Sequence, residues 1–343
     1  MAKESATTKR YIGYEIGKRI DSFCYKIKFD KWKGWVYLAP AIVLLLIFTG
    51  WPIINTVRYS FLEGYNSMLA LNPNHEFNVG IGNYLYVVNY HGFQTCLSNT
   101  IILCVLTVPI STFLALLIAV CLNSIKFLNR FLQTIYFLPY VTNSIAIGMV
   151  FAAMFNIVGY NPSDITKSTS LGIVNNIIQF FGGTPINWIN ANAHKENMWA
   201  VFTVMVIYIV WNALPFKILI LLGGLQSVNK QYYDAAKIDA TPKWRVFTKI
   251  TVPLLSPMIA YVVITGFIGG FKEYSSIVGI FGDKMGPPGG ARVLNTMVGY
   301  IYEAINGSTK QYGRASAAAI ILFLIIFAVT LVNLAVSKKK THY

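Results

Sequence analysis

The sequence has too little charge to cover the surface of a soluble globular protein. Only 12% of its 343 residues are charged, while 55% are apolar and the mean hydropathy is +0.54. An ordinary soluble domain carries about 25% charged residues. A lipid bilayer is therefore the solvent that suits this chain, and we expect a membrane protein.

Acidic residues are the scarcest charged type, with 13 of them against 28 lysines and arginines. The resulting net charge of +15 could suggest a nucleic-acid partner. Binding of nucleic acid needs basic residues that gather on one face of a folded domain. Here they lie between long apolar runs, so we expect no nucleic-acid partner.

Cysteine and histidine form no pattern that is typical of a metal site or a disulfide framework. The four cysteines include no CxxC pair, and the four histidines are scattered singly along the chain. We also find no nucleophile and base at a usable spacing, which disfavours a membrane enzyme. The sequence therefore predicts no metal, no bound cofactor and no catalytic residue.

Six stretches are long and apolar enough to cross a bilayer as helices. About 20 such residues span the hydrocarbon, and a spanning segment must satisfy its own backbone hydrogen bonds. The long unbroken runs lack the short alternating strands of a barrel. The sequence therefore predicts an all-α integral membrane protein with six transmembrane helices, at 35–54, 99–122, 131–155, 198–222, 254–280 and 315–336.

The distribution of lysine and arginine orients these helices. Most of them lie in the N-terminal segment, the second and fourth gaps and the C-terminal tail, although the other gaps are longer. The positive-inside rule then places both termini in the cytoplasm. Four basic residues in the fifth gap, and Lys272 in the span before it, run against the rule, which long external loops tolerate. We expect a basic N-terminal segment at 1–34, a transmembrane domain at 35–336 and a cytoplasmic tail at 337–343.

The fourth gap, at 229–257, has the local pattern of a helical hairpin. Asn229 is a good N-cap for a first helix through about Ile238, and Thr241 followed by Pro242 is a start signal for a second. Apolar residues recur every three to four positions in the second helix. They are Phe247, Ile250 and Leu254. We expect a compact, charge-bearing docking element on the cytoplasmic side.

The hairpin resembles the EAA loop of ABC importer permeases, the coupling helix that seats in a cleft of the cytoplasmic ATPase subunit. The matching residues are Asp234, Ala235, Ala236, Asp239, Phe247, Ile250, Pro253 and Pro257. Asp234 replaces the glutamate of the family, and Ala240 stands where the family has glycine. A left-handed turn costs an L-residue about 1 to 2 kcal/mol, so Ala240 predicts either a strained turn or a turn of another shape.

The resemblance assigns ATPase coupling to one set of residues in the hairpin. They are Tyr233, Asp234, Ala235, Ala236, Asp239, Ala240, Phe247 and Pro253. The chain contains no GxxxxGK[ST] phosphate loop. ATP and Mg²⁺ are therefore expected on partner subunits, and this chain is not itself expected to be an enzyme.

The resemblance covers nearly the whole chain after residue 35 and is most similar to the maltose-type branch, the carbohydrate and glycerophosphate permeases. The segments that carry it are 99–100, 137–140, 172–175, Trp188, 223–226, 286–290, 300–302 and 312–317. It implies import of a sugar or oligosaccharide by alternating access in the cell membrane. The implied partners are a second homologous permease, two ATPase subunits, an extracellular or periplasmic solute-binding protein, and membrane lipid.

Aromatic and polar side chains inside the predicted spans are suited to a sugar path. Aromatic faces stack on sugar rings, and polar groups at membrane depth are costly and usually functional. The candidates are Tyr140, Asn143, Trp211, Asn212, Lys217, Phe271, Glu273 and Tyr274. Lys217 is the only basic residue well inside a span, and the sequence favours snorkelling of its side chain to the cytoplasmic surface over a place in the path.

Two interpretations remain open beside the sugar importer. A permease of the same architecture could carry glycerol 3-phosphate or another small polar solute, and an anion would favour Lys217 in the path. An ion-coupled secondary transporter would need intramembrane carboxylates, which the first four predicted spans lack.

Two local patterns add to this interpretation. Pro109 lies beside Thr107, Ser111 and Thr112, and such a break survives in a membrane as a packing kink or beside a wet cavity. In the third gap, apolar residues alternate with Asn and Gln between 173 and 181, which predicts an amphipathic element on the outer face.

Overall fold

The regular structure of the protein is helical. The computed structural model describes residues 33–72, 76–125, 131, 134–135, 138, 140–308 and 310–340. In this part of the chain the only β-structure is two isolated bridges, Leu62 with Val79 and Val158 with Ser170. The predicted all-α fold is confirmed. The chain divides into two compact units at Arg58 and Tyr59, and each is described by itself.

The first unit contains the predicted first span. Helix α2 (Lys33–Leu45) continues through a π-helical turn, η2 (Leu46–Gly50), into α3 (Trp51–Phe61). The π turn precedes Pro52, whose ring would collide with the carbonyl of the residue four positions earlier in a regular α-helix. A turn widened by one residue relieves that collision. Together these elements form a 28-residue apolar helix, Gly34–Phe61.

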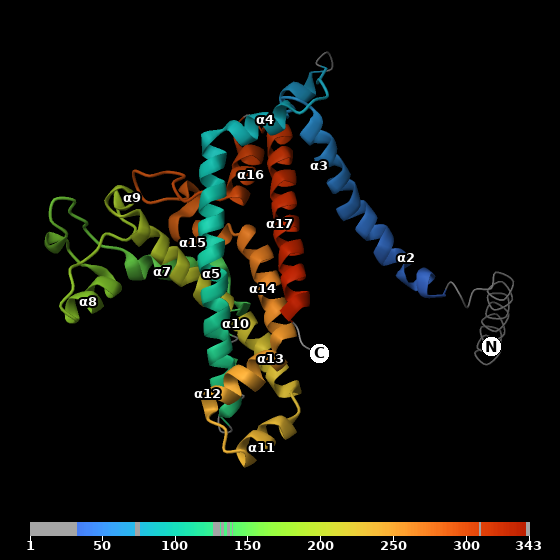
Figure 1. Ribbon diagram of the computed structural model, residues 1–343. Coiled ribbons are helices and arrows are strands. Elements are labelled where there is room, and N and C mark those ends of the chain that lie inside the picture. The colour runs from blue at the N-terminus through green and yellow to red at the C-terminus, as the bar shows by residue number, and fades with distance from the viewer. Residues whose placement is uncertain are drawn as a thin grey trace, which may run out of the picture. The chain divides into compact units, whose positions relative to one another are not determined.

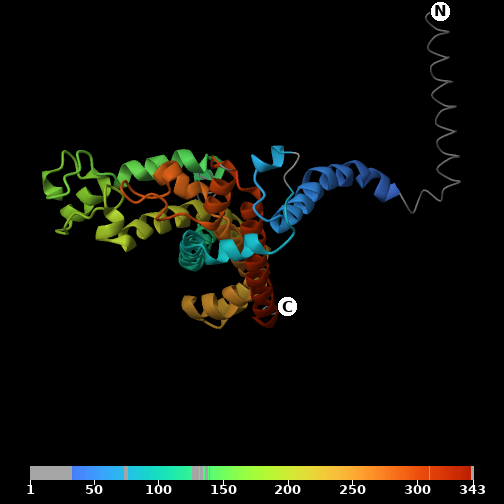
Figure 2. The same cartoon turned by 90° about the horizontal axis from the view of Figure 1, so that it is seen from above.

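The second unit is built on long helices that pack side by side. Helix α10 (Met198–Ser227) packs along α5 (His91–Ser124), and α14 (Ser256–Phe271) packs against both α5 and α17 (Tyr312–Lys340) (Figure 1). Seen from above, α7 (Ser144–Phe155) extends to the side of α5 away from α17 (Figure 2).

Shorter elements connect these helices. At the end of the unit away from the hairpin lie α4 (Gly82–Asn89), α16 (Met297–Asn306) and the loops around them (Figure 1). The remaining short helices are η3 (Leu69–Leu71), η4 (Ile165–Lys167), α8 (Gly172–Phe180), α9 (Ala193–Glu196), α11 (Lys230–Ile238), α12 (Lys243–Val246), η5 (Phe247–Thr251), α13 (Val252–Leu254), α15 (Ser275–Phe281) and η6 (Gly282–Lys284).

Small residues let α14 approach α5 closely. A Cβ atom built on Gly270 would lie 2.7 Å from Sγ of Cys104, and one on Gly266 would lie 3.1 Å from Cγ1 of Val108. The four-residue spacing of these glycines places both on one face of α14. In a membrane, where no hydrophobic effect drives helices together, such close packing supplies the attraction.

The predicted fifth span does not continue to residue 280. Helix α14 ends at Phe271, and α15 begins at Ser275 as a separate helix that packs on α7. The break is stabilised by Glu273, whose Oε1 accepts the backbone N–H groups of Tyr274 and Ser276 at 3.2 and 3.1 Å. The carboxylate thus accepts backbone N–H groups at the start of α15. The prediction of one continuous helix from 254 to 280 is therefore wrong.

The predicted third span, at 131–155, is also interrupted. Much of its first half lies outside the described residues, as do the basic segment before residue 33 and the last three residues of the tail. Helix α7 starts only at Ser144, where Oδ1 of Asn143 accepts the backbone N–H of Ile145 at 2.8 Å. Asn143 therefore caps a helix that begins midway through the predicted span.

Four helices in the described part of the chain are long and apolar enough to span a membrane. They are Gly34–Phe61, His91–Ser124, Met198–Ser227 and Tyr312–Lys338. A fifth is added if the bent pair Lys243–Leu254 and Ser256–Phe271, which meet at 68°, counts as one span. The predicted number of six stays a prediction.

The predicted amphipathic element of the third gap forms α8, with an unusual distribution of side chains. Asn175 is buried, and its side chain binds the backbone of Ile186 through both its oxygen and its nitrogen. Ile173, Ile177 and Phe180 are exposed. The apolar face of α8 therefore points away from the protein.

Candidate functional site

A cavity lined by apolar and polar side chains lies between α5, α10 and α14 in the second unit. Its volume is about 310 Å³. We call it the central cavity. Its lining residues are Thr107, Val108, Ser111, Tyr140, Ile209, Asn212, Ala213, Phe216, Lys217, Thr265, Gly266, Gly269, Gly270 and Glu273. Hydroxyl, amide and charged groups thus meet aromatic faces inside a bundle of apolar helices.

Lys217 is buried in this cavity and does not snorkel. Its side chain is 5% exposed, and Nζ donates to Oγ of Ser111 at 2.7 Å and to Oγ1 of Thr112 at 3.0 Å. The carbonyl of Val108 accepts a third, longer bond at 3.3 Å. The ammonium therefore points across to α5, and the interpretation that it reaches the cytoplasmic surface is wrong.

The physical reason is that α5 offers the ammonium a full set of acceptors. Pro109 lies one residue beyond Val108, and Ser111 and Thr112 follow it. Gly266 leaves room on the opposite wall, because a Cβ atom there would lie 3.2 Å from Nζ. A buried ammonium is tolerated only when its donors are satisfied. In the described part of the chain no carboxylate lies within ion-pair distance of Lys217, although Glu273 lines the same cavity.

The structure brings half of the predicted path residues together. Those that line the central cavity are Tyr140, Asn212, Lys217 and Glu273. The ring of Tyr140 stacks with that of Phe216, with centroids 5.8 Å apart. The amide of Asn212 reaches Oγ of Ser144 at 3.5 Å, which joins α10 to α7.

The other predicted path residues lie outside the cavity lining. Asn143 caps α7, and Trp211 packs against Phe151 with ring centroids 5.3 Å apart. Phe271 is buried in the apolar cluster between α5 and α17. Tyr274 packs against Tyr302, with ring centroids 5.1 Å apart. Their side chains are used for packing and capping in this conformation.

Sequence reasoning missed several lining residues on α5 and α14. Thr107 and Ser111 were expected only as neighbours of a helix break at Pro109, and Thr265 was not singled out. The hydroxyl groups beside that proline are the one sequence signal that could have identified this wall. Thr265 and the glycines of α14 carry no such signal, because small residues also occur wherever helices pack closely.

The hairpin at 229–257 begins as predicted. Oδ1 of Asn229 accepts the backbone N–H of Gln231 at 3.0 Å, and α11 follows from Lys230 to Ile238. The first helix then closes with two backbone bonds, from Ala240 to Lys237 at 3.1 Å and from Thr241 to Ala236 at 2.9 Å. This pair of bonds is the Schellman motif.

Ala240 occupies the position of that motif that requires a left-handed residue. Its φ is +47°. Glycine is favoured there because it has no Cβ atom to collide with the following carbonyl. The sequence left two alternatives for this turn, a strained residue or a different shape. The structure has the usual shape, and Ala240 is the strained residue.

The second helix of the hairpin starts one residue later than the proline rule predicts. Pro242 has extended backbone angles and acts as the N-cap, so α12 begins at Lys243 and Thr241 does not cap it. The helix then passes through the π turn η5, which again ends two residues before a proline, Pro253. It bends by 68° at Leu255 and continues as α14. The hairpin is thus covalently continuous with a wall of the central cavity.

The hairpin has one face fixed to the bundle and one face exposed. Phe247 packs against the apolar cluster at the ends of α5 and α10, and Ala236 is 5% exposed. The hydroxyls of Tyr233 and Thr251 lie 3.3 Å apart and join its two helices.

The exposed face carries large apolar side chains together with charge. Ile238 is 86% exposed and Trp244 is 72% exposed. Asp234 and Lys237 form an exposed ion pair at 2.9 Å. Ala235 and Asp239 are also exposed. An exposed apolar patch rimmed by charge is typical of a protein docking surface.

Comparison with known proteins agrees with this architecture. Residues 107–342 match the family described as the binding-protein-dependent transport system inner membrane component. The lactose transport system permease protein LacF of Rhizobium radiobacter is 29% identical over 296 residues, which are 85% of this chain and 90% of the relative. The arabinooligosaccharides transport system permease protein AraP of Bacillus subtilis is 31% identical over 305 residues, 88% of each chain.

A solved structure has the same fold. A chain in the crystal structure of a bacterial alginate ABC transporter, in complex with an alginate pentasaccharide-bound periplasmic protein, superposes with a TM-score of 0.69. The match covers 93% of this chain and 99% of that chain at 20% identity. Since the family description matches more than half of the sequence, the chain belongs to the inner membrane components of binding-protein-dependent transport systems, as an ABC importer permease of the maltose type.

Proposed function

We propose that this permease carries a sugar or oligosaccharide across the membrane through the central cavity. The observation that carries the proposal is the cavity itself, where the hydroxyls of α5, the amide of Asn212 and the aromatic rings of Tyr140 and Phe216 surround a buried ammonium. Aromatic faces and hydrogen-bonding groups of this kind suit a hydroxylated ring. Relatives that are named for lactose and arabinooligosaccharide transport support a carbohydrate cargo.

The hairpin couples an ATPase to this cavity. A movement of α11 and α12 passes through the bend at Leu255 into α14, and α14 lines the cavity with Thr265, Gly266 and Gly269. Closure of two ATPase subunits would thereby tilt one wall of the cavity as a rigid body. ATP and Mg²⁺ bind to those subunits, because this chain has no phosphate loop.

The proposed assembly contains a second homologous permease, two ATPase subunits and an external solute-binding protein. Both termini lie in the cytoplasm. The family description supports a binding protein as partner, and α17 ends on the same side of the second unit as the hairpin, which agrees with a cytoplasmic tail (Figure 1). The domain division at 35–336 and the role of the coupling residues rest on the resemblance described above.

The unpaired ammonium of Lys217 favours a second candidate cargo. A small anionic solute such as glycerol 3-phosphate would pair with this charge in the cavity. An ion-coupled secondary transporter is disfavoured because α5, α10 and α17 contain no Asp or Glu, and the cavity carboxylate of Glu273 already accepts two backbone N–H groups.

Uptake by the complete complex in sealed vesicles tests the proposal. We expect uptake of a labelled oligosaccharide only when ATP is present with the ATPase subunits. Ala235→Asp places a charge on the exposed docking face, so we expect ATPase co-purification and uptake to be lost while membrane insertion is normal.

The matched control is Ser308→Asp, which adds the same charge at an exposed position far from the hairpin in sequence. It should leave ATPase co-purification and uptake unchanged. Full co-purification of the ATPase with Ala235→Asp would contradict the docking role, and uptake driven by an ion gradient without ATP would contradict the importer.

A further inference from the structure

A second pocket, separate from the central cavity, lies at the end of the second unit opposite the hairpin. Its volume is about 430 Å³, within the range of about 300 to 1,000 Å³ that is usual for ligand sites. We call it the outer pocket. It lies between α4, the start of α5, the loop before α16, α16 and the start of α17, and it shares no lining residue with the central cavity.

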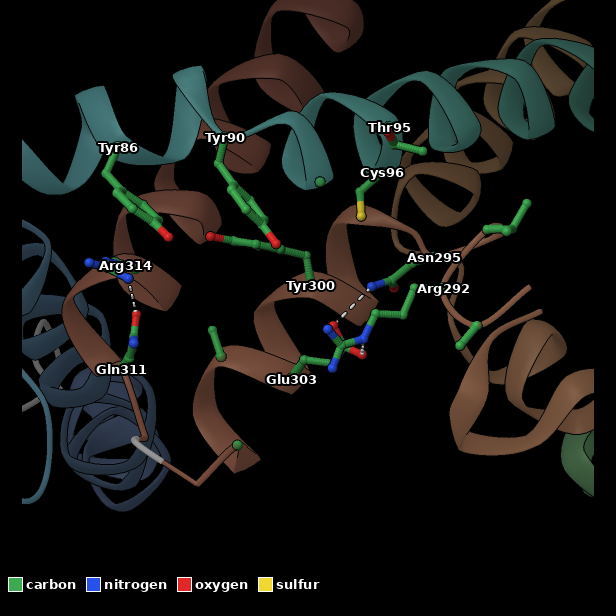
Figure 3. Close-up of a pocket in the computed structure, with 15 residues that line it drawn as sticks. Tyr86, Tyr90, Thr95, Cys96, Arg292, Asn295, Tyr300, Glu303, Gln311 and Arg314 are labelled. Atoms are coloured by element: carbon green, nitrogen blue, oxygen red, sulfur yellow. Dashed lines mark hydrogen bonds and ion pairs between the residues drawn. The ribbon is translucent and has the colours of Figure 1, made fainter. Parts of the chain in front are cut away.

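Three tyrosines provide an aromatic wall of the outer pocket. The rings of Tyr86 and Tyr90 stack with centroids 5.8 Å apart, and the ring of Tyr300 lies 6.1 Å from that of Tyr90 (Figure 3). Tyr86 and Tyr90 are each about two-fifths exposed, at 41% and 42%. Burial raises the pKa of Tyr300 to about 12. The exposed parts of such aromatic side chains pack against the rings of sugars.

The opposite wall carries a neutralised cation. Nε of Arg292 binds Oε1 of Glu303 at 2.8 Å, and Nδ2 of Asn295 donates to Oε2 of the same carboxylate at 3.1 Å (Figure 3). Both oxygens of Glu303 are thus occupied by protein donors. This wall offers polar groups for hydroxyls but no net charge.

Arg314 supplies a charge that remains unbalanced. Its guanidinium lies 3.5 Å from the centroid of the Tyr86 ring and donates to Oε1 of Gln311 at 2.5 Å (Figure 3). In the part of the chain that the structure describes, no carboxylate lies within ion-pair distance of Arg314. The pocket therefore has a net positive charge that lies next to the Tyr86 ring.

The same combination occurs twice along the chain. The outer pocket contains Arg314 beside Tyr86, and the central cavity contains Lys217 near Tyr140 and Phe216. In the described residues neither cation has a carboxylate within ion-pair distance, although Glu273 lines the same cavity as Lys217, so only the outer pocket has a net positive charge. A neutral sugar would need the aromatic and hydrogen-bonding groups of the outer pocket but not the charge of Arg314.

We infer that the outer pocket is a receiving site for an acidic sugar, and that the cargo class of this permease is a uronate-containing saccharide. The ring of a uronate packs on the exposed part of the tyrosine wall, while its carboxylate pairs with Arg314, which has the planar donor edge that suits carboxylates. The inference rests on the proposed function for its transport step, whereas binding at the outer pocket can be measured without transport.

Binding of digalacturonate to the full-length permease in lipid nanodiscs tests this site, with maltose as the neutral disaccharide of equal ring number. We expect calorimetry to show that digalacturonate binds more tightly than maltose. Arg314→Gln should weaken digalacturonate binding about tenfold, because one charge-assisted pair is lost, and should leave maltose binding unchanged. Arg314→Lys, which keeps the charge but loses the planar edge, should have an intermediate affinity.

The matched control is Lys310→Gln, which removes one positive charge from an exposed residue that does not line the pocket. It should bind digalacturonate as the unchanged protein does. Equal affinity for the two disaccharides, or no effect of Arg314→Gln, would overturn the inference. So would absence of digalacturonate binding together with weaker capture of the solute-binding protein by Arg314→Gln, because the pocket would then accept a protein side chain.

Uptake measurements separate this inference from the proposed function. ATP-driven uptake of neutral sugars without digalacturonate binding would leave the importer intact and overturn the acidic cargo. Binding of digalacturonate that depends on Arg314, in a complex that transports no sugar with ATP, would support the site and contradict the importer.

Discussion

Ala240 occupies a left-handed backbone position in the turn of the hairpin, where any residue with a Cβ atom is strained. The two backbone hydrogen bonds that close α11 require this conformation. The turn therefore forms although the backbone of Ala240 is strained. The strain lies in the element that we propose to contact the ATPase. A local gain in stability is therefore available at this position.

We predict that Ala240→Gly stabilises the hairpin by about 1 kcal/mol, because glycine adopts a positive φ without strain. Hydrogen exchange of the α11 amides in the full-length chain should then slow about fivefold. Ala235→Gly is the matched control, since the same substitution inside α11 should destabilise the helix by about 1 kcal/mol. Faster exchange in Ala240→Gly would contradict the strained turn.

Lys217 shows the limit of sequence reasoning for single residues. Lys217 is close enough to the end of α10 for a long side chain to reach the surface. Sequence spacing alone cannot distinguish this snorkelling from burial in the cavity. The deciding partners, Ser111 and Thr112, lie on another helix more than a hundred residues earlier. The hairpin residues were easier to predict, because the cap at Asn229 and the turn at Ala240 depend on neighbours in sequence.

At the scale of the elements, two π turns precede prolines in the described chain. They are η2 before Pro52 and η5 before Pro253. In a regular α-helix the proline ring would meet the carbonyls of Phe48 and Lys249, which are the middle residues of these turns. One extra residue in a turn rotates everything beyond it by about 100° about the helix axis. The π turn η5 thereby sets the direction in which the hairpin faces relative to α14.

We predict that Pro253→Ala lets η5 relax to a regular α-helix and turns the hairpin relative to the bundle. Spin labels at Ile238 and Ser124, both exposed, should show a changed distance distribution, and ATP-driven uptake should fall several-fold. Pro257→Ala is the matched control, because Pro257 lies in the first turn of α14, where no helical bond is lost. An unchanged distance distribution would show that the proline does not maintain the turn.

The sequence predicted where the long apolar helices lie but not where two of them break. The runs at 99–122, 198–222 and 315–336 became α5, α10 and α17, since twenty apolar residues have few alternatives in a membrane. The predicted fifth span failed at Glu273, whose carboxylate caps α15 through two backbone bonds. The predicted third span failed at the Asn143 cap. Capping depends on side-chain rotamers that hydropathy does not report.

At the scale of the whole molecule, one bent helix joins the exposed face of the hairpin to the central cavity. Three elements follow one another along the sequence: the hairpin, the bend at Leu255 and the glycine face of α14. A movement of the hairpin is therefore transmitted along a helix to the cavity wall. The central claim is that this movement switches the side of the membrane from which the cavity can be entered.

Labelling of Thr265→Cys by a membrane-impermeant maleimide tests that claim most directly, in the complete complex in vesicles and with the four native cysteines replaced. Thr265 lines the central cavity on α14. We predict that the reagent reaches this position from one side without nucleotide and from the opposite side when the ATPases are trapped closed with ATP and vanadate. Labelling from the same side in both states would contradict the account.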